Sequence, residues 1–374
     1  MNISDSSKIQ YQDYIKKMKV IHKALFSFLE NDDINKNDDY YFSLKNLLIE
    51  EKILLNHHEF KTFLHLLAEF SAQHHRGQYF IKNIEDMLRA IKDEVKNNFE
   101  NYEIFKIFQN NKRILLFLSE EKILNIDCSI FKLMTEDTLK QKFYPQYFYP
   151  EIKEFLKPSD RRDIHDENSE DFKIFEEKRK TGENDEYLCQ LIRTDSVEEF
   201  IAYTNLHNID LTSTIKPSIF ETNSFLLEHK ETTLVEYAAF FGSIQIIRYF
   251  VQIKIKLNPS IWVYAIHSNS GDLVHFLEPI IKDDEMLLKS FHESIKCNHN
   301  QIAKYIKDTY FFDSELSSIK IFQSNNFEFF DEKSFEDFPL RKIIKYDYTL
   351  VFDLVLKEKI IDLTLPMILN NLFQ

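Results

Sequence analysis

Glycine and proline are scarce in this sequence. Its 374 residues include four glycines and eight prolines, and no proline precedes Pro145. All-β folds need these residues for their many tight turns, so the composition argues against such folds. Hydrophobic residues make up 44% of the chain and charged residues 29%, which excludes a chain that is disordered throughout. We therefore expect an all-α protein.

Cysteine and long hydrophobic runs are also scarce. Cys128, Cys189 and Cys297 are odd in number and widely spaced, which indicates reduced, mostly buried thiols and argues against a disulfide framework or a zinc site. Wholly apolar runs are short, as in ILLFL at 114–118, and the N-terminal residues lack a basic flank followed by an apolar core. The sequence thus predicts a soluble intracellular protein, in the cytoplasm rather than the nucleus.

Positive charge is in deficit. The formal net charge is −14, whereas binding to phosphate groups is driven largely by Lys and Arg side chains that release counterions. We expect neither nucleic acid nor an anionic membrane surface as a partner.

A helix–turn–helix pattern recurs along the chain. In YAAFFGSIQIIRYFVQ, residues 237–252, Ala239 closes an apolar pair, Gly242 follows in the turn, and Ile246 starts a second apolar stretch. This spacing predicts one helix that ends near Gly242, a short turn and a second helix. The same spacing recurs at Ile107, Asn110 and Ile114, at Ile266, Asn269 and Leu273, at Ile295, Asn298 and Ile302, and at Ile344, Asp347 and Val351.

The turn of each unit contains a glycine, an asparagine or an aspartate. These residue types are the ones that adopt a left-handed backbone at the lowest cost. We therefore expect a structural role for Gly242, and a positive φ angle at all five turn positions. These positions are Gly242, Asn269, Asn298, Asn110 and Asp347.

The segment TLVEYAAFFGSIQIIRYF, residues 233–250, resembles the ankyrin repeat. Thr233 and Ala238 match the pattern T-P-L-H-x-A, and a glycine and an apolar second helix follow. Over most of residues 100–310 the chain also resembles a large uncharacterised family of ankyrin-repeat proteins that is expanded in parasitic protists. The segments that carry this second resemblance are FYPEIKEFL, EEKRKTGENDEYLCQLIRTDSVEEFI, TIKPSIFETNSFLL, EYAAFFGSIQIIRYF and ESIKCNHNQIAKYI.

These resemblances imply a solenoid of stacked helix–turn–helix repeats that binds partners, and they imply no reaction and no catalytic residues. The chain departs from the ankyrin pattern, since Leu234 stands in place of the proline and Glu236 in place of the histidine. The spacing from Ala239 to Ile266 is also shorter than the ~33 residues of a standard repeat. We therefore expect degenerate repeats with short or absent hairpin tips.

Charge and composition suggest a domain boundary. Residues 158–186 are highly charged and contain few large apolar side chains. We interpret them as a linker or excursion between an N-terminal helical lobe, residues 1–157, and a C-terminal ankyrin-repeat lobe, residues 187–374. Residues 208–232 form a long insertion before the clearest repeat, and we favour self-packing as its role.

No motif for a metal site or for catalysis is complete. Asp33, Asn35 and Asn37 have the spacing of the first EF-hand ligands, but Leu44 stands where the final glutamate belongs. The segment HHEFKT starts like a zinc-protease helix but has Thr62 at the second ligand position. Phosphate-loop, dinucleotide-binding and nucleophile-elbow motifs are absent as well. We expect no metal, no cofactor and no enzymatic activity.

The aligned repeats suggest a surface for a partner. Phe240 and Phe241 follow the small residues of the clearest unit, and His267 and Lys296 occupy aligned positions in the next two units. In ankyrin-like stacks the end of the first helix approaches the surface that binds partners, and adjacent aromatic residues there are candidate anchors. We predict a protein-binding site at these four residues. The alternative is that the rings, Phe241 in particular, pack against a neighbouring repeat.

Together these patterns predict a non-catalytic scaffold or adaptor that binds another protein. The negative charge of the chain favours a partner with a basic patch. One alternative is an enzyme or regulator whose site is assembled across the two lobes, for example from His74, His75 and Arg76 facing acidic residues. Another alternative is a structural protein that associates with itself.

Overall fold

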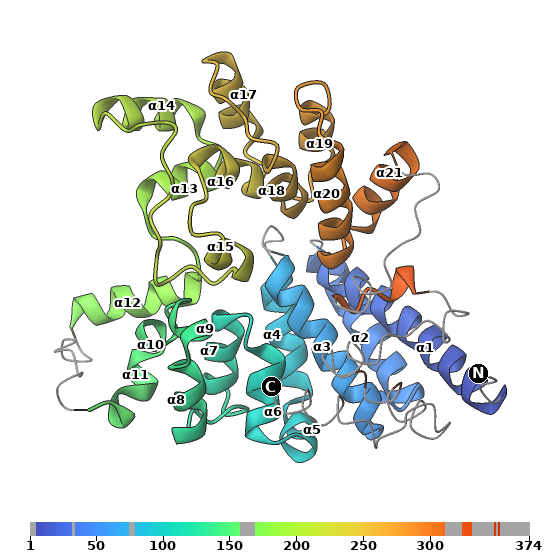
Figure 1. The fold of residues 1–374 in the computed structure, drawn as a ribbon. Helices are drawn as coiled ribbons and strands as arrows, with labels where there is room; N and C mark the ends of the chain where they lie inside the picture. The colour runs from blue at the N-terminus through green and yellow to red at the C-terminus, as the bar shows by residue number, and fades with distance from the viewer. Residues whose placement is uncertain are drawn as a thin grey trace, which may run out of the picture. The chain divides into compact units, whose positions relative to one another are not determined.

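The structure is helical throughout the part of the chain that it describes. This computed structural model describes residues 5–31, 34–74, 79–157, 169–310, 324–330, 348 and 351. Within these ranges the regular elements are α-helices and short 3₁₀ helices, and the β structure is limited to one isolated antiparallel bridge between Thr214 and Thr233. The expectation of an all-α fold is confirmed (Figure 1). No helix of these ranges has the length and the apolar composition that crossing a membrane requires.

The chain divides into two compact units. Unit 1 contains Met1–Leu66 and Ser314–Gln374, and unit 2 contains Leu67–Asp313. The division falls inside helix α3 (His57–Gln73). It differs from the lobes expected from the sequence, because the described part of the expected linker lies within unit 2. Residues 158–168 of that linker lie outside the described residues.

Polar and aromatic contacts connect the helices of unit 1. The hydroxyl groups of Tyr14 and Thr62 share a hydrogen bond of 2.9 Å, and the ring of Phe327 lies edge-on to that of Tyr14 at a centroid distance of 6.2 Å. Lys17 pairs with Glu59 at 2.7 Å. The described elements of this unit are α1 (Asp5–Leu29), α2 (Ile34–Glu50), η1 (Ile53–Leu55), the first part of α3, and η4 (Phe327–Phe329).

The described part of unit 2 contains four consecutive helix pairs. In each pair a short turn joins two helices, and the first helices pack on one another in chain order: α13 on α16, α16 on α18, and α18 on α20 (Figure 1). The pairs are α13 (Tyr187–Arg193) with α14 (Val197–Leu206), α16 (Leu234–Phe241) with α17 (Ile244–Gln252), α18 (Ile261–His267) with α19 (Gly271–Leu277), and α20 (Asp284–Lys296) with α21 (Asn300–Tyr310).

The turns inside these pairs have the left-handed backbone that the sequence predicts. The φ angle is 67° at Gly242, 49° at Asn269 and 57° at Asn298. Asp195 takes the same position in the first pair, with a φ angle of 52°. The sequence pattern missed this pair because Glu199 stands where the pattern requires an apolar residue. The shared turn geometry makes the four pairs copies of one local unit.

The prediction for the turn at Asn110 is wrong. Asn110 does not have a positive φ angle, and the next residue, Asn111, is the N-cap of α7 (Lys112–Glu120), where its side chain accepts two backbone N–H hydrogen bonds. An asparagine that caps a helix has an extended backbone, so α6 (Asn101–Phe108) and α7 are joined by a different turn. Asp347 lies outside the described residues.

The remaining helices of unit 2 lie before the first pair or between the first two pairs. One of them, α12 (Glu170–Thr181), carries the buried Arg179. This side chain makes two hydrogen bonds of 2.8 Å to the carboxylate of Glu151 and one of 2.8 Å to the backbone oxygen of Tyr147. This bidentate pairing anchors part of the segment that the sequence suggested as a linker. These helices are α4 (Phe80–Ala90), α5 (Lys92–Asn98), α6, α7, α8 (Cys128–Met134), α9 (Asp137–Lys140), α10 (Tyr144–Tyr147), α11 (Tyr149–Ile152), η2 (Lys153–Phe155), α12 (Glu170–Thr181) and α15 (Ser224–Glu228).

Candidate functional site

Most of the residues predicted to bind a partner lie in the interior of unit 2. Phe240 is 0% exposed, Phe241 9% and His267 1%. The ring of Phe240 lies 5.8 Å from that of Phe225 and 5.0 Å from that of His267, and it stacks on both. Packing, the alternative to partner binding, therefore describes the positions of these side chains. In this structure they offer almost no surface to another protein.

The cover over these residues comes from the insertion before the clearest repeat. Phe225 in α15 is buried, and its ring contacts Tyr264 at 5.0 Å and His267 at 4.1 Å, in addition to Phe240. These contacts agree with the self-packing role favoured for residues 208–232. The alignment of repeats could not show this, because the covering segment lies outside the repeated pattern.

His267 and Lys296 meet at one carboxylate. The Nε2 atom of His267 lies 3.0 Å from Oε1 of Glu293, and the ammonium group of Lys296 lies 2.8 Å from the same oxygen. Burial lowers the pKa of His267, and the hydrogen bond to Glu293 offsets only part of this. Burial would raise the pKa of Glu293, but the hydrogen bond from His267 and the charge of Lys296 outweigh it and lower the pKa to about 2. The network thus joins a neutral imidazole, a carboxylate and an ammonium group.

The same cluster has the residue types of a metal site. One ligand atom each from His267, Glu293 and Cys297 lies within 4.8 Å of the other two. However, the ammonium group of Lys296 already occupies the Glu293 oxygen. Burial also raises the pKa of the Cys297 thiol well above its usual value, whereas metal binding requires the thiolate. We interpret the cluster as an internal network that stabilises the packing of α18 on α20.

The histidine segment that the sequence singled out is described only in part. His74 is buried, and its ring stacks on Phe80 at 4.7 Å and meets the edge of His299 at 4.7 Å. His75 and Arg76 lie outside the described residues. The described histidine therefore takes part in packing within unit 2.

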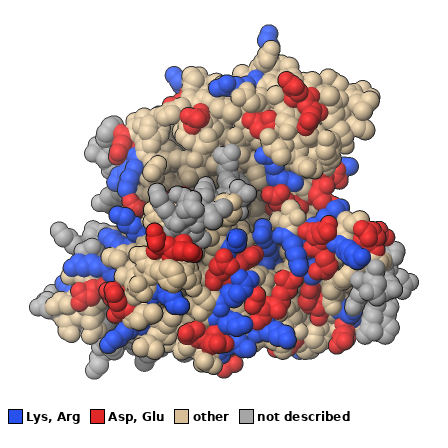
Figure 2. All heavy atoms as spheres, turned by 180° about the vertical axis from the view of Figure 1, so that it is seen from behind, with Lys and Arg blue, Asp and Glu red and all other residues tan. Residues whose placement is uncertain are grey.

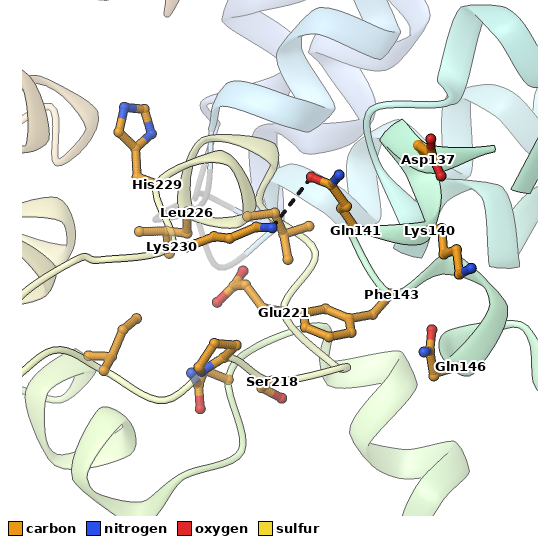
Figure 3. A pocket seen from close by; sticks show the side chains of 14 residues that line it. Asp137, Lys140, Gln141, Phe143, Gln146, Ser218, Glu221, Leu226, His229 and Lys230 are labelled. Atoms are coloured by element: carbon orange, nitrogen blue, oxygen red, sulfur yellow. Dashed lines mark hydrogen bonds between the residues drawn. The ribbon is translucent and has the colours of Figure 1, made fainter. Parts of the chain in front are cut away.

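A separate pocket lies between the region of α9 and α10 and the insertion that precedes α16 (Figure 3). Its volume is 460 Å³, and small-molecule sites typically have ~300–1,000 Å³. Five of its fourteen lining residues are apolar and nine are polar or charged. The apolar lining residues are Phe143, Ile215, Pro217, Leu226 and Leu227, the polar ones include Asn184, Ser218 and Glu221, and the exposed charged ones are Asp137, Lys140 and Lys230.

Hydrogen bonds from distant parts of the chain fix the walls of this pocket. The buried Lys112 of α7 donates to the backbone oxygens of Lys142 at 3.1 Å and Ile219 at 2.9 Å, so it joins the two walls. The hydroxyl group of Ser218 donates to Asp185 at 2.7 Å. Walls that are held in this way are organised before any ligand arrives, which lowers the entropy lost on binding.

Glu221 is a buried carboxylate in the lining. Its side chain is 6% exposed, and its Oε1 atom accepts the backbone N–H of Asn223 at 2.8 Å. The Oε2 atom is buried and makes no hydrogen bond to a described residue. Burial raises the pKa of Glu221, and the hydrogen bond from Asn223 and the charge of Lys112 offset only part of this. A carboxylate that lines a pocket and accepts a single hydrogen bond keeps acceptor capacity that a ligand can use.

Sequence reasoning did not find this pocket. Its walls come from residues around Phe143 and Glu221, which are far apart in the chain. The signal that was available is Glu221 itself, a carboxylate that stands between Phe220 and Phe225 in the largely apolar stretch IFETNSFLL. A charged residue in such a stretch is usually exposed, and a buried one usually has a partner.

No protein-family model, no curated protein and no solved structure matches the chain.

Proposed function

We propose that this protein is a non-catalytic scaffold or adaptor that binds another protein on an ankyrin-like series of helix pairs. The observation that carries the proposal is the repetition within unit 2, where Asp195, Gly242, Asn269 and Asn298 give four consecutive turns the same left-handed backbone. Repeats that stack in this way present equivalent positions side by side, and protein binding is a frequent use of such extended surfaces.

Hydrogen bonds between consecutive pairs support a rigid stack. The carboxylate of Asp195, in the turn of the first pair, accepts the backbone N–H groups of Gln245 and Ile246 at 3.0 Å each. The turn of one pair thus caps the second helix of the next pair. A stack that is fixed in this way presents side chains to a partner with little further loss of conformational entropy.

A row of exposed apolar side chains marks the candidate contact surface. Leu206, Ile253 and Ile280 stand at or just beyond the C-terminal ends of α14, α17 and α19, and they are 76%, 40% and 41% exposed. Single exposed apolar residues are ordinary, but here three consecutive pairs carry one at similar positions. We call these three residues the exposed row. In the proposal a protein partner packs on this row, in place of the buried Phe240 and His267.

Charge adds to the description of the partner. The net charge of −14 favours encounter with a protein that carries a basic patch. Figure 2 shows one face of the molecule, on which Lys and Arg side chains are interspersed with Asp and Glu. Such a mixed face does not offer the continuous positive surface that nucleic acid requires.

The test changes the exposed row and leaves the core intact. Substitution of Phe240 is unsuitable, because loss of a buried ring costs about 3–5 kcal/mol of folding free energy. The row variant combines Leu206→Glu, Ile253→Glu and Ile280→Glu. Its matched control combines three changes at exposed apolar residues of unit 1: Val20→Glu, Ile49→Glu and Leu55→Glu. Each tagged protein is incubated in lysate of the source cells, cross-linked, purified and analysed by quantitative mass spectrometry.

We expect the wild type and the control to retain the partner at least ~10-fold more than the row variant, since apolar anchors dominate many interfaces. Equal retention by all three proteins would contradict the proposed surface. If the chain recovers only itself, self-association replaces the adaptor role, and light scattering of the purified protein would then show the mass of a dimer or a larger oligomer.

A further inference from the structure

The pocket beside α9 and α10 has the size and the walls of a small-molecule site. Its volume is 460 Å³. Phe143, Ile215, Leu226 and Leu227 give it apolar walls, and the two leucines are themselves buried. An apolar molecule that entered would remove apolar surface from water on both sides, which is the main source of affinity in such pockets.

Glu221 gives this pocket one strong hydrogen-bond acceptor. Figure 3 shows its side chain in the middle of the lining, with Lys230 on one side and Ser218 on the other. Its Oε1 atom accepts one hydrogen bond, from Asn223, and its buried Oε2 atom has no donor among the described residues. A carboxylate can accept about four hydrogen bonds. Glu221 lines the pocket and accepts one from a described residue, so it keeps acceptor capacity for a molecule in the pocket.

Three basic side chains around the pocket have acceptors of their own. Lys112 donates to two backbone oxygens, and Lys230 approaches the side-chain oxygen of Gln141 at 3.4 Å. The Nδ1 atom of His229 lies 2.8 Å from the backbone oxygen of Phe225. The hydrogen-bonding capacity of Glu221 is thus left for a donor from outside the chain.

We propose that this pocket binds a mainly apolar small molecule that carries an amine, and that the amine pairs with Glu221. An ammonium group suits a buried carboxylate best, because hydrogen bonds between ionised groups are shorter and stronger than those between neutral groups. Lys140 and Lys230 outnumber Asp137 in the lining, but all three are exposed, so solvent and salt screen their charges. The site does not depend on the proposed protein-binding row, which lies on other helices.

Three probes with the same apolar body test the head group. Phenylbutylamine carries an ammonium group, phenylbutanol a neutral hydroxyl group and phenylbutyrate a carboxylate. Their binding to the full chain is measured by isothermal titration calorimetry and by saturation-transfer NMR. We expect submillimolar binding of the amine, and binding of the alcohol and the acid that is weaker by at least ~10-fold.

Two matched variants test the carboxylate. Glu221→Gln keeps the shape of the side chain and an oxygen for the N–H of Asn223, but it removes the charge. This substitution should weaken binding of the amine by ~10-fold or more and leave binding of the alcohol unchanged. Glu231→Gln changes an exposed glutamate of the same insertion and should bind the amine like the wild type.

A further variant tests the void independently of the carboxylate. Ile215→Trp fills the pocket from its wall and should abolish binding of the amine even if Glu221→Gln proves unstable. Circular dichroism verifies that each variant is folded. Equal binding of amine and alcohol, tighter binding of the acid, amine binding that survives either substitution in the pocket, or no amine binding to the wild type would each overturn the inference.

Discussion

At the scale of single residues, the turn after α16 explains why this chain places one of its few glycines at position 242. Gly242 ends α16 with a φ angle of 67°, a conformation that costs a residue with a Cβ atom about 1–2 kcal/mol. Gly271, at the start of α19, does not have a positive φ angle, and no neighbouring atom lies within 4 Å of the place that a Cβ atom would occupy. The same substitution should therefore act in opposite directions at the two sites.

We expect Gly242→Ala to lower the free energy of unfolding by about 1 kcal/mol, and Gly242→Asn to lower it less. Gly271→Ala should raise it by up to ~1 kcal/mol, because alanine favours the helix and restricts the unfolded chain. Urea unfolding followed by circular dichroism measures both effects. Equal losses at the two glycines would show that the left-handed turn is not the reason for Gly242.

Lys112 leads to a pH dependence of stability. Burial disfavours its ammonium form and lowers its pKa to about 7 from the usual 10.5, while Glu221 acts to raise the pKa and Lys142 to lower it. Between these two values the unfolded chain binds the proton more strongly than the folded protein does. The free energy of unfolding should therefore rise as pH increases, by roughly 1–2 kcal/mol between pH ~7 and ~8.5.

Lys112→Met removes the titrating group, so this rise should disappear, whatever the overall stability of the variant. The difference between the urea midpoints of the two proteins across that pH range measures the effect. Buried thiols such as that of Cys297, whose pKa is raised in the folded protein, also change stability near pH 8.5, but they do so in both proteins alike. Lys254→Met changes an exposed lysine and should keep the rise. If the rise persisted in Lys112→Met, it would belong to other groups.

At the scale of elements, α15 decides whether the residues at the ends of α16 and α18 are accessible. Phe225 lies against Phe240 and His267, so Phe225→Ala should lower the free energy of unfolding by about 3–4 kcal/mol. It should also speed amide hydrogen exchange in α16 and α18. Leu206→Ala, at a 76% exposed position, should do neither. Unchanged exchange in the Phe225 variant would mean that α15 is not the cover.

The elements also show which features a sequence reveals. The turns at Gly242 and Asn298 follow from residue type and short-range spacing, because a left-handed turn is a local structure. The burial of Phe240 depends on Phe225, which lies outside the repeated pattern. The pocket is likewise assembled from residues as distant as Lys112 and Glu221, and no local spacing encodes such a contact.

At the scale of the whole molecule, composition predicted the fold class, but charge did not reveal the boundaries of the units. The scarcity of glycine and proline correctly indicated an all-α protein. The charge of residues 158–186 indicates a linker or an excursion, and Arg179 within them is 2% exposed and pairs with Glu151, 28 residues earlier. A run of charges shows how polar a segment is, whereas its pairing partners decide whether the segment is anchored.

The net charge of the whole chain supports a prediction about the proposed partner. A charge of −14 attracts a basic surface over distances that salt screens, with a Debye length of ~10 Å at 0.1 M salt. For a partner with a basic patch, we expect association to slow by ~10-fold or more between ~50 and ~500 mM NaCl, and dissociation to change little. Surface plasmon resonance measures the two rates separately.

The exposed row should affect the dissociation rate. Replacing Leu206, Ile253 and Ile280 by alanine removes apolar contacts with the partner, so the complex should dissociate faster. The replacement changes no charge, so the salt dependence of the association rate should stay the same. The apolar and the electrostatic contributions can then be separated in one experiment. An association rate that does not change with salt would reject the basic patch on the partner, and it would leave the apolar contact to account for binding alone.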